Sequence, residues 1–493
     1  MSKKDEKFPA EAYKKNVLAE CFADAKEYFF DEYQQVDLAY AVMLGEQGII
    51  TTDERAAILR ALTTLDFEAL KAADYDGTFE DFFYLRQREI LANCDPDIAG
   101  KLHTGRSRND IDVTIYRLRL RKEILPLIDS AIDLKSVLLD LAGRHIDTLM
   151  PAYTHTQPAQ PTTISHYLLA MAENIGRDIL RLQRAFENMN FCPLGSGAIT
   201  TSGFAISRHR LAELLGFTGP TVNSYGSIAS VDYFTEALGA VAALLVNVGK
   251  FAQEFLLMAM VEFGVIRLPD GYVQGSSIMP QKRNPVALEH IRAIGSKALG
   301  QALSVFTAVH NTPFGDINDV EDDLQPLIYR AVRDANRAVS LFSNTLRSAE
   351  FDIEKLRKKA GEDFITVTEL ADTIVRKEGL SFQIAHRLVG NAVKSAIAAG
   401  SNITPEILRR EAESVLNRPL RLTDAEIGEA ISPDNFVNVR KIFGGPAPVE
   451  TQRALSVEFQ RNDEAREWFR STQKFLETGA QKLENAVKES LNM

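Results

Sequence analysis

Residues 237–258 read ALGAVAALLVNVGKFAQEFLLM and contain the longest uncharged apolar run of the chain. Their apolar side chains recur mainly at three- and four-residue steps, the period of an α-helix, as in Leu238, Val241, Leu245 and Val248. They cover more than one side of that helix, and a helix that is apolar most of the way round is buried against several partners. We expect some of those partners to be other subunits, because one chain of this size has few places in which to bury such a helix.

A second long helix is predicted between Thr114 and Leu149, where apolar residues recur mostly at the same steps. They are Ile115, Leu118, Ile124, Ile128, Ile132, Leu138 and Leu141. Pro126 is expected either to kink this helix or to mark an early break in it. Because alternating strand patterns bounded by Asn-Gly or Asp-Gly are scarce elsewhere, the sequence predicts an all-α protein with a long central helix bundle.

Three helical parts are expected along the chain. Residues 1–109 form an N-terminal helical domain, residues 110–360 hold the long helices, and residues 361–493 form a shorter helical end. Within that end, the Gly and Pro residues of Gly444–Pro448 predict a loop.

The composition limits the classes of function. The chain has 493 residues, of which 45% are hydrophobic and 25% charged, and a formal net charge of −11. It therefore has no general positive field for nucleic acid or an anionic membrane, and positive charge for an anionic substrate must be local. The apolar run at 237–248 is also too short to span a bilayer.

Cysteine usage and the N-terminal residues point to a cytoplasmic protein. Cys21, Cys94 and Cys192 are few, odd in number and widely spaced, which is typical of a reducing compartment and gives no disulfide framework. Residues 1–7 are polar and lack the apolar core of a signal peptide. We also find no HxxxH, HExxH or CxxC spacing, no Walker A motif and no dinucleotide fingerprint, so no metal and no cofactor are expected.

The segment Gly275–Pro285, GSSIMPQKRNP, carries the clearest chemical signal. Its Gly lets the backbone approach a ligand closely, and its two prolines fix the shape of a loop between helices. Any one of its residues taken alone is compatible with an ordinary polar loop. The whole string resembles the signature loop GSSxMPxKxNP of the fumarase/aspartase superfamily, whose members eliminate fumarate from succinyl substrates.

The segment His103–Asp110, HTGRSRND, concentrates two guanidinium groups in eight residues. An Arg side chain offers a planar fork that binds a carboxylate through two hydrogen bonds. The alternative is a structural role, with Asn109 or Asp110 capping the helix that follows. The segment resembles a motif of the argininosuccinate lyase branch of the superfamily, which implies that Ser107 and Arg108, together with Asn109, bind substrate.

The segment Met150–Pro161, MPAYTHTQPAQP, presents a His on a stiff, proline-rich support. A lone His is more often a structural residue than a catalyst. This segment, however, resembles the THxQ loop of the same branch. The resemblance implies that Thr154 contacts a substrate carboxylate, and that His155 pairs with a Glu just after the signature loop, at the position of Glu289.

The reaction that this resemblance implies is an anti β-elimination. A base removes a proton next to a carboxylate, and the resulting dianion expels an amine to leave fumarate. The dianion needs preorganised donors and positive charge, and the departing amine needs an acid of near-neutral pKa. Family resemblance assigns the base to Ser276, and the acid to His155 supported by Glu289.

The expected site residues follow from these matches. The expected catalytic residues are Ser276, His155, Lys282 and Glu289. The expected substrate-binding residues are Ser107, Arg108, Asn109, Thr154, Gln157, Ser277, Met279 and Asn284.

The half of the pocket that should hold the amine departs from the argininosuccinate lyase pattern. The Tyr, Gln and Lys of the family fall on Asp316, Glu321 and Leu324, and the Ser of the family GSIAH motif falls on Asp37. These changes make that half more acidic, which suits a polyamine-type cation such as ethylenediamine. In this respect the chain resembles ethylenediamine-disuccinate (EDDS) lyases, which split aminopolycarboxylates into fumarate and amine.

Two alternatives stay open at this point. The changes can be drift within an argininosuccinate lyase, or the chain can be a non-catalytic relative of the lens-crystallin type. The superfamily resemblance further implies a homotetramer in which each active site combines the Ser107–Arg108, Thr154–His155 and Ser276 loops of three subunits. The expected partners are thus the succinyl-amine substrate, fumarate and other copies of the chain, with no nucleic acid and no membrane.

Overall fold

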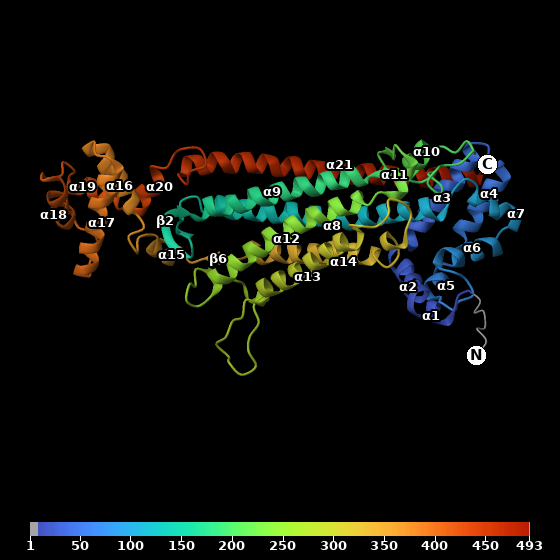
Figure 1. Ribbon diagram of the computed structural model, residues 1–493, viewed down its shortest axis with the longest axis horizontal. Coiled ribbons are helices and arrows are strands. Elements are labelled where there is room, and N and C mark those ends of the chain that lie inside the picture. The colour runs from blue at the N-terminus through green and yellow to red at the C-terminus, as the bar shows by residue number, and fades with distance from the viewer. Residues whose placement is uncertain (1–7, 493) are drawn as a thin grey trace.

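The computed structural model describes residues 8–492 and confirms the all-α prediction. Five long helices run along the length of an elongated molecule (Figure 1). They are α8 (Arg108–Arg144), α9 (Ile164–Met189), α12 (Asp232–Ala259), α13 (Val286–Val309) and α14 (Gln325–Arg347). Each packs against at least two of the others, so together they form the predicted central bundle.

Shorter helices cover the N-terminal end of α8. They are α1 (Glu11–Tyr13), η1 (Lys14–Leu18), α2 (Ala19–Tyr28), α3 (Phe30–Glu46), α4 (Thr52–Thr63), α5 (Phe67–Ala72), α6 (Phe82–Ala92), α7 (Pro96–Gly100) and η2 (Lys101–His103). Further short helices lie between the long ones: α10 (Arg208–Leu214), α11 (Ser224–Ala229), η3 (Asp270–Tyr272) and η4 (Asn318–Val320).

The strands are few and short. They are β1 (Leu149–Thr154), β2 (Gln157–Thr163), β3 (Phe191–Cys192), β4 (Gly219–Pro220), β5 (Ile266–Arg267) and β6 (Glu350–Phe351). Each belongs to a two-stranded sheet, and β1 with β2 forms an antiparallel hairpin.

Helix α8 continues through Pro126, so the expected early break is wrong. It ends at Arg144 rather than extending to Leu149, which begins β1. A proline inside a helix removes one hydrogen bond and crowds the preceding turn. Here α8 packs against α9, α14 and a late helix, α21 (Pro448–Asn492), and this burial outweighs the local preference for a break.

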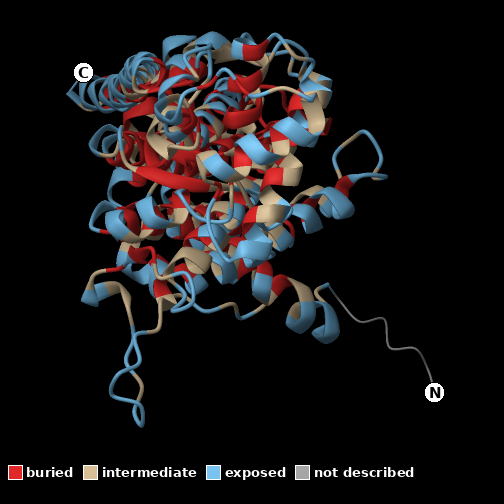
Figure 2. Ribbon diagram, turned by 90° about the vertical axis from the view of Figure 1, so that its left-hand side faces the viewer, coloured by how far each residue is buried: buried red, intermediate tan, exposed pale blue. Residues whose placement is uncertain are grey.

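One apolar core runs through the bundle and into the N-terminal helices. It extends in sequence from Phe22 to Val487 and is buried at the centre of the end-on view (Figure 2). A second, smaller core lies among residues 370–430. It is formed by α16 (Val367–Glu378), α17 (Phe382–Ala399), α18 (Pro405–Leu416) and α19 (Asp424–Ala430), and it is bordered by α15 (Ile353–Ala360) and α20 (Pro433–Asn438).

The end of the chain differs from the shorter helical end that the sequence suggested. The predicted loop is present at Gly444–Pro446, but α21 then continues for 45 residues and returns along α8 and α9. Its Leu455, Phe469 and Leu483 belong to the main core. The division at 1–109, 110–360 and 361–493 stays a prediction, and residues 448–492 belong by packing to the bundle.

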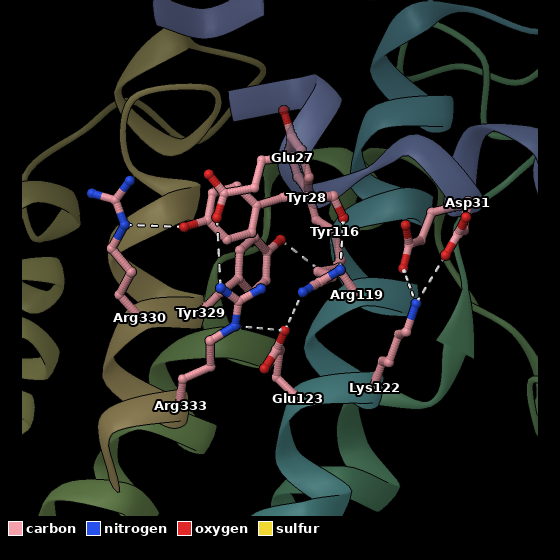
Figure 3. Close-up of polar contacts among 11 residues, drawn as sticks. Glu27, Tyr28, Asp31, Tyr116, Arg119, Lys122, Glu123, Tyr329, Arg330 and Arg333 are labelled. Carbon is pink, nitrogen blue, oxygen red and sulfur yellow. Dashed lines mark hydrogen bonds and ion pairs between the residues drawn. The ribbon is translucent and has the colours of Figure 1, made fainter. Parts of the chain in front are cut away.

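Figure 3 shows how the N-terminal helices are tied to the bundle. The Arg330 side chain of α14 donates to the Tyr28 hydroxyl at 3.0 Å, and Arg119 of α8 donates to the Tyr28 carbonyl at 3.1 Å. Glu123 of α8 pairs with both Arg119 and Arg333. These charged contacts fix the position of α2 against the side of the bundle.

Helix α12 is, among residues 8–492, the one helix that is long and apolar enough by composition to cross a membrane, with a mean hydropathy of 1.4. It packs against α9, α13 and α14, as expected for a bundle helix that is apolar on several sides.

A buried ion pair holds α21 to α8. The Lys135 ammonium lies 2.9 Å from Glu458, and both side chains are less than 5% exposed. Arg461 contacts the same carboxylate at 2.6 Å, but its side chain is 64% exposed. The Glu458 charge therefore depends mainly on Lys135 for compensation inside the protein.

We predict that Lys135→Met lowers the free energy of unfolding by about 3–5 kcal/mol, because it leaves the Glu458 carboxylate buried without its main partner. The double variant Lys135→Met/Glu458→Leu should recover most of that loss. Arg461→Met is the matched control and should change stability by about 0–1 kcal/mol, since its side chain is exposed. Denaturant unfolding measures all three, and a Lys135→Met protein as stable as the double variant would contradict the prediction.

Candidate active site

The Gly275–Pro285 loop leaves the bundle between α12 and α13 and extends away from it (Figure 1). Its base is closed by Gln274 and Asn284, whose backbones exchange two hydrogen bonds of 2.9 Å. Within the loop, the Ser276 hydroxyl oxygen accepts hydrogen bonds from the backbone N–H groups of Met279 at 3.1 Å and Ile278 at 3.4 Å. The loop thus aims two backbone dipoles at one serine oxygen.

An open cleft of about 1070 Å³ lies at the base of this loop. Its lining includes Met279, Lys282, Asn284 and Glu289, four of the residues expected in the site. Lys282 and Glu289 are exposed, and Glu289 lies in the first turn of α13. Positive charge and hydrogen-bond donors therefore meet on one wall of the cleft.

The expected substrate-binding segment forms the start of α8. Ser107 is the N-cap of this helix, and Asp110 completes a capping box with it. The alternative that Asn109 or Asp110 is the cap is therefore wrong. The second oxygen of Asp110 accepts from the backbone N–H groups of Gly195 at 2.7 Å and Gly197 at 3.0 Å, which ties the segment to a neighbouring loop. Helix N-termini favour anions, so Ser107–Asn109 are suited to a carboxylate ligand.

The expected THxQ segment forms the tip of the β1–β2 hairpin. Thr154 pairs with Gln157, which leaves His155 and Thr156 as a two-residue turn. Both turn residues have positive φ, 50° and 63°, a conformation that non-glycine residues seldom adopt. Backbone strain of this kind clusters at functional sites. The hairpin holds the His155 side chain exposed at its end.

These three segments do not meet within one chain. Ser107 precedes α8 and the hairpin follows its far end, and a 37-residue helix is about 55 Å long. The Ser276 loop leaves the bundle at a third place (Figure 1). The expected pair of His155 with Glu289 is accordingly not formed in the single chain.

Carboxylates surround the Arg108 guanidinium. It forms ion pairs with Asp81 and, at 3.3 Å, with Asp112, which also accepts a hydrogen bond from the Tyr33 hydroxyl at 3.2 Å. Burial alone would lower the pKa of Arg108, but the charges of Asp112 and Asp81 raise it above its usual value. Arg108 is thus fixed in place as a permanent cation.

Further acidic side chains lie next to this cluster, just before α14. Burial raises the pKa of Glu321 to about 9, with contributions from a hydrogen bond and the negative charge of Asp316. Burial also raises the pKa of Asp322, against the opposing charge of Arg108, and that of Asp112 to about 7. The predicted acidic half of the pocket therefore places Asp316 and Glu321 together, and it includes Asp112 and Asp322 as well.

The expectation that Asp37 adds free negative charge to the acidic half of the pocket is wrong. Asp37 is 4% exposed, and its two oxygens pair with Arg86 at 3.1 Å and Arg106 at 2.9 Å. Its charge is therefore compensated inside the protein. Leu324, which stands where the family pattern has a Lys, is buried at the N-cap of α14 and carries no charge.

Sequence reasoning missed Asp81, Asp112 and Asp322. A signal for Asp112 was present, because Arg108 and Asp112 are four residues apart on one helix and such pairs attract. Asp81 and Asp322 come from distant segments, and their proximity follows from the packing of α6 and the segment before α14 around α8. Among residues 8–492, no group of three or more His, Cys, Asp and Glu side chains is arranged to hold a metal ion.

Comparison with known proteins places the chain in a family. Residues 25–300 match the family described as Lyase, and residues 364–438 match that described as Argininosuccinate lyase C-terminal. The chain is 40% identical to argininosuccinate lyase 2 of Agrobacterium fabrum, with 91% of this chain and 90% of that protein covered. It is 38% identical to argininosuccinate lyase of Methanoculleus marisnigri, with 90% and 89% covered.

Comparison with solved structures shows that other enzymes share the fold of this chain. EDDS lyase in complex with formate, and a variant of EDDS lyase with bound fumarate, each give a TM-score of 0.87 at 28% identity over 97% of both chains. A class II fumarase from Schistosoma mansoni shares the fold, with a TM-score of 0.66 at 17% identity over 83% of this chain and 90% of that chain.

The fold and the matches define a fumarate-forming carbon–nitrogen lyase. Within that class, the chain belongs to the argininosuccinate lyase branch of the fumarase/aspartase superfamily.

The acidic cluster predicts a pH dependence of stability. Between about pH 4.5 and about pH 9, folded Glu321 keeps a proton that the unfolded chain has lost, so the free energy of unfolding falls as pH rises through this window. Glu321→Gln keeps a neutral side chain in place and should flatten this fall. Asp319→Asn, at an exposed neighbouring position, is the control and should leave the slope unchanged. Unfolding midpoints across the window test this, and identical slopes for wild type and Glu321→Gln would contradict it.

Proposed function

We propose that this lyase eliminates fumarate from a diamine-derived N-substituted aspartate, an aminopolycarboxylate such as ethylenediamine-N,N′-disuccinate. Its first elimination would leave N-(2-aminoethyl)aspartate, and a second would leave ethylenediamine. The observation that carries this proposal is the cluster of Asp112, Asp316, Glu321 and Asp322 beside Arg108. The alternative is cleavage of argininosuccinate to arginine and fumarate, which the names of the 38–40% identical relatives favour.

The succinyl half of the substrate would be bound by donors from all three segments. Ser107, Asn109 and Arg108 supply the helix N-terminus and a guanidinium, and Lys282 supplies an ammonium. Although Asp81 and Asp112 hold Arg108, each terminal nitrogen of a guanidinium carries two N–H groups, so Arg108 keeps donors for a substrate carboxylate. Thr154, Gln157, Ser277, Met279 and Asn284 complete the proposed binding set.

Ser276 would act as the base that removes the proton next to the carboxylate. A serine hydroxyl is a poor base unless its alkoxide is stabilised. The N–H groups of Met279 and Ile278 already point at the Ser276 oxygen, which supports that stabilisation. Lys282 on the same loop would add positive charge as the dianion forms.

His155, with Glu289 of another subunit, would protonate the departing amine. A carboxylate partner raises the pKa of a His and fixes its tautomer. The exposed position of His155 on a two-residue turn suits a side chain that completes a neighbouring subunit's site.

The acidic half would receive the amine. A diammonium or ammonium group forms charge-assisted hydrogen bonds with carboxylates, and its arrival would favour the ionised form of Glu321. Argininosuccinate would bring the α-carboxylate of its arginine part into this half. Leu324 offers that carboxylate no partner, and the charge of Asp316 would repel it. N-(2-aminoethyl)aspartate has no carboxylate beyond its reacting succinyl group, whereas the distal succinyl group of ethylenediamine-N,N′-disuccinate would need a further donor.

We further propose that the active unit is a homotetramer built on the long helices. Apolar side chains lie exposed on the single chain on three bundle helices: Leu180 of α9, Val246 of α12, and Leu303 and Phe306 of α13 are 36–52% exposed. Burial of such side chains against other copies would stabilise the assembly. The assembly would also bring the Ser107–Arg108 and Thr154–His155 segments of other subunits to the Ser276 loop, which a single chain cannot do.

Replacing the proposed base should remove activity without unfolding the protein. We predict that Ser276→Ala lowers kcat by about 10²–10⁴-fold or more, because proton abstraction loses its acceptor. The absorbance of fumarate in the ultraviolet measures the rate, and circular dichroism with light scattering checks fold and assembly. A Ser276→Ala enzyme with nearly wild-type kcat would show that the base is another group.

Shared sites should permit complementation. Ser276→Ala and His155→Ala are each expected to be inactive, but random reassembly of equal amounts should restore roughly one quarter of the sites, since each loop comes from a different subunit. As a control, Ser276→Ala mixed with the double variant Ser276→Ala/His155→Ala should stay inactive. No recovery in the first mixture after verified exchange of subunits, or a stable active monomer by light scattering, would refute shared sites.

Substrate choice tests the proposed function itself. Burial of the arginine α-carboxylate of argininosuccinate without a partner should cost about 2–5 kcal/mol. It should therefore lower kcat/KM for argininosuccinate roughly 30- to 4000-fold relative to the best diamine-derived aspartate. In the addition direction, Glu321→Gln should raise the KM for ethylenediamine roughly tenfold or more while leaving the KM for fumarate nearly unchanged. The exposed neighbour variant Asp319→Asn should change neither. Equal efficiency on both substrates would make the chain an argininosuccinate lyase.

A further inference from the structure

Two buried arginines share one carboxylate beneath the start of α8. Arg86 of α6 is 1% exposed, and its Nη2 donates to Asp37 at 3.1 Å and to Gln34 at 2.9 Å. Arg106, two residues before α8, is 9% exposed and donates from Nη1 to the other oxygen of Asp37 at 2.9 Å. The group thus links α3, α6 and the segment that leads into α8.

Several N–H donors of this group have no acceptor. Arg86 Nε, Arg86 Nη1 and Arg106 Nε are buried, and none of them has a hydrogen-bond partner among residues 8–492. Nδ1 of His103, which lines the same pocket as these arginines, is likewise buried and has no hydrogen-bond partner among these residues. A buried donor without an acceptor costs about 1–3 kcal/mol, and more when the donor is charged.

The same side chains enclose a small cavity. Its walls include Asp37, Arg86, His103 and Arg106, and the remainder is mainly apolar, from Phe83, Ile90 and Leu102. Its volume of about 20 Å³ is sufficient for one water-sized particle. The unpaired donors and the cavity therefore lie together.

The charges around this cavity do not balance. Two guanidinium groups face one carboxylate, Asp37, among the described residues that line it. Burial and the charge of Arg106 lower the pKa of His103, so His103 is neutral and can donate from Nδ1. The buried carboxylate of Asp110 also acts on Arg106, but it lies outside the lining and accepts its hydrogen bonds from the backbones of Ser107, Gly195 and Gly197. The lining itself therefore carries one positive charge in excess, which is costly when buried unless an anion compensates it.

We propose that this cavity binds one small monovalent anion of the size of chloride. Such an ion accepts hydrogen bonds from Arg86, Arg106 and His103 together and brings the charge of the lining residues to zero. A water molecule would fit the space but leave the excess charge. The ion would anchor the approach to Ser107 and so help to position the substrate-binding end of α8.

Halide dependence of stability tests the proposal directly. The melting temperature should rise with chloride or bromide concentration at constant ionic strength, when sodium gluconate supplies the remainder, because gluconate is too large for the cavity and ligands that bind the folded state stabilise it. In crystals grown with bromide, an anomalous peak should lie within hydrogen-bond distance of Arg86 and Arg106. A halide-independent melting temperature together with the absence of such a peak would overturn the proposal.

Two variants that change the charge of the cavity lining in opposite directions make the test more specific. Arg86→Met balances Asp37 against Arg106 and should abolish the chloride dependence, whereas Asp37→Asn leaves two uncompensated cations and should shift the chloride midpoint to lower concentration. Arg88→Met is the matched control, since this arginine lies on the same helix α6 with its side chain 55% exposed, and it should respond to chloride like the wild type. Equal chloride responses in wild type, Arg86→Met and Asp37→Asn would refute the site.

Discussion

The stiffness and length of α8 constrain everything else in this protein. A helix of 37 residues keeps its two ends about 55 Å apart, with Ser107 at one end and the Thr154–His155 hairpin beyond the other. Packing against α9, α14 and α21, together with the Lys135–Glu458 pair, prevents the helix from bending to bring them together. A chain built in this way needs other copies of itself to complete a site that uses both ends. The geometry of this one helix therefore supports the proposal that several copies of the chain share each site.

Electrostatics divides the proposed site into two halves. The proposed assembly would bring fixed donors to the succinyl group: the N-terminus of α8, Lys282, and the backbone N–H groups directed at Ser276. Carboxylates gather before α14, where the amine would lie, and burial keeps the pKa of Glu321 near 9. Arg108 lies between these halves and is held by Asp81 and Asp112, so its position does not depend on a ligand. A substrate with an anionic end and a cationic end matches this division.

The sequence analysis succeeded where chemistry is local and went wrong where packing decides. The helical period of residues 237–258 and the loop at Gly275–Pro285 were interpretable because each depends on neighbours along the chain. Pro126 was over-interpreted, since the neighbours of α8 stabilise the helix through it. The cap of α8 was placed at Asn109 or Asp110, whereas Ser107 takes that role. Asp37 was assigned to the amine half as a free charge. Its two arginine partners come from α6 and from the segment before α8, so the sequence did not reveal that its charge is compensated.

By itself, the sequence determined the all-α class, the superfamily and the three segments that carry the expected chemistry, because periodicity and short motifs are written in consecutive residues. Tertiary structure decided which charges meet. Asp81, Asp112 and Asp322 surround Arg108, and Arg86 and Arg106 enclose Asp37, through contacts between residues far apart in the chain. It also decided that α21 returns along the bundle instead of ending the chain as a short domain. The physical reason is the same in each case: burial and Coulomb energy depend on distance in space, which a linear pattern does not specify.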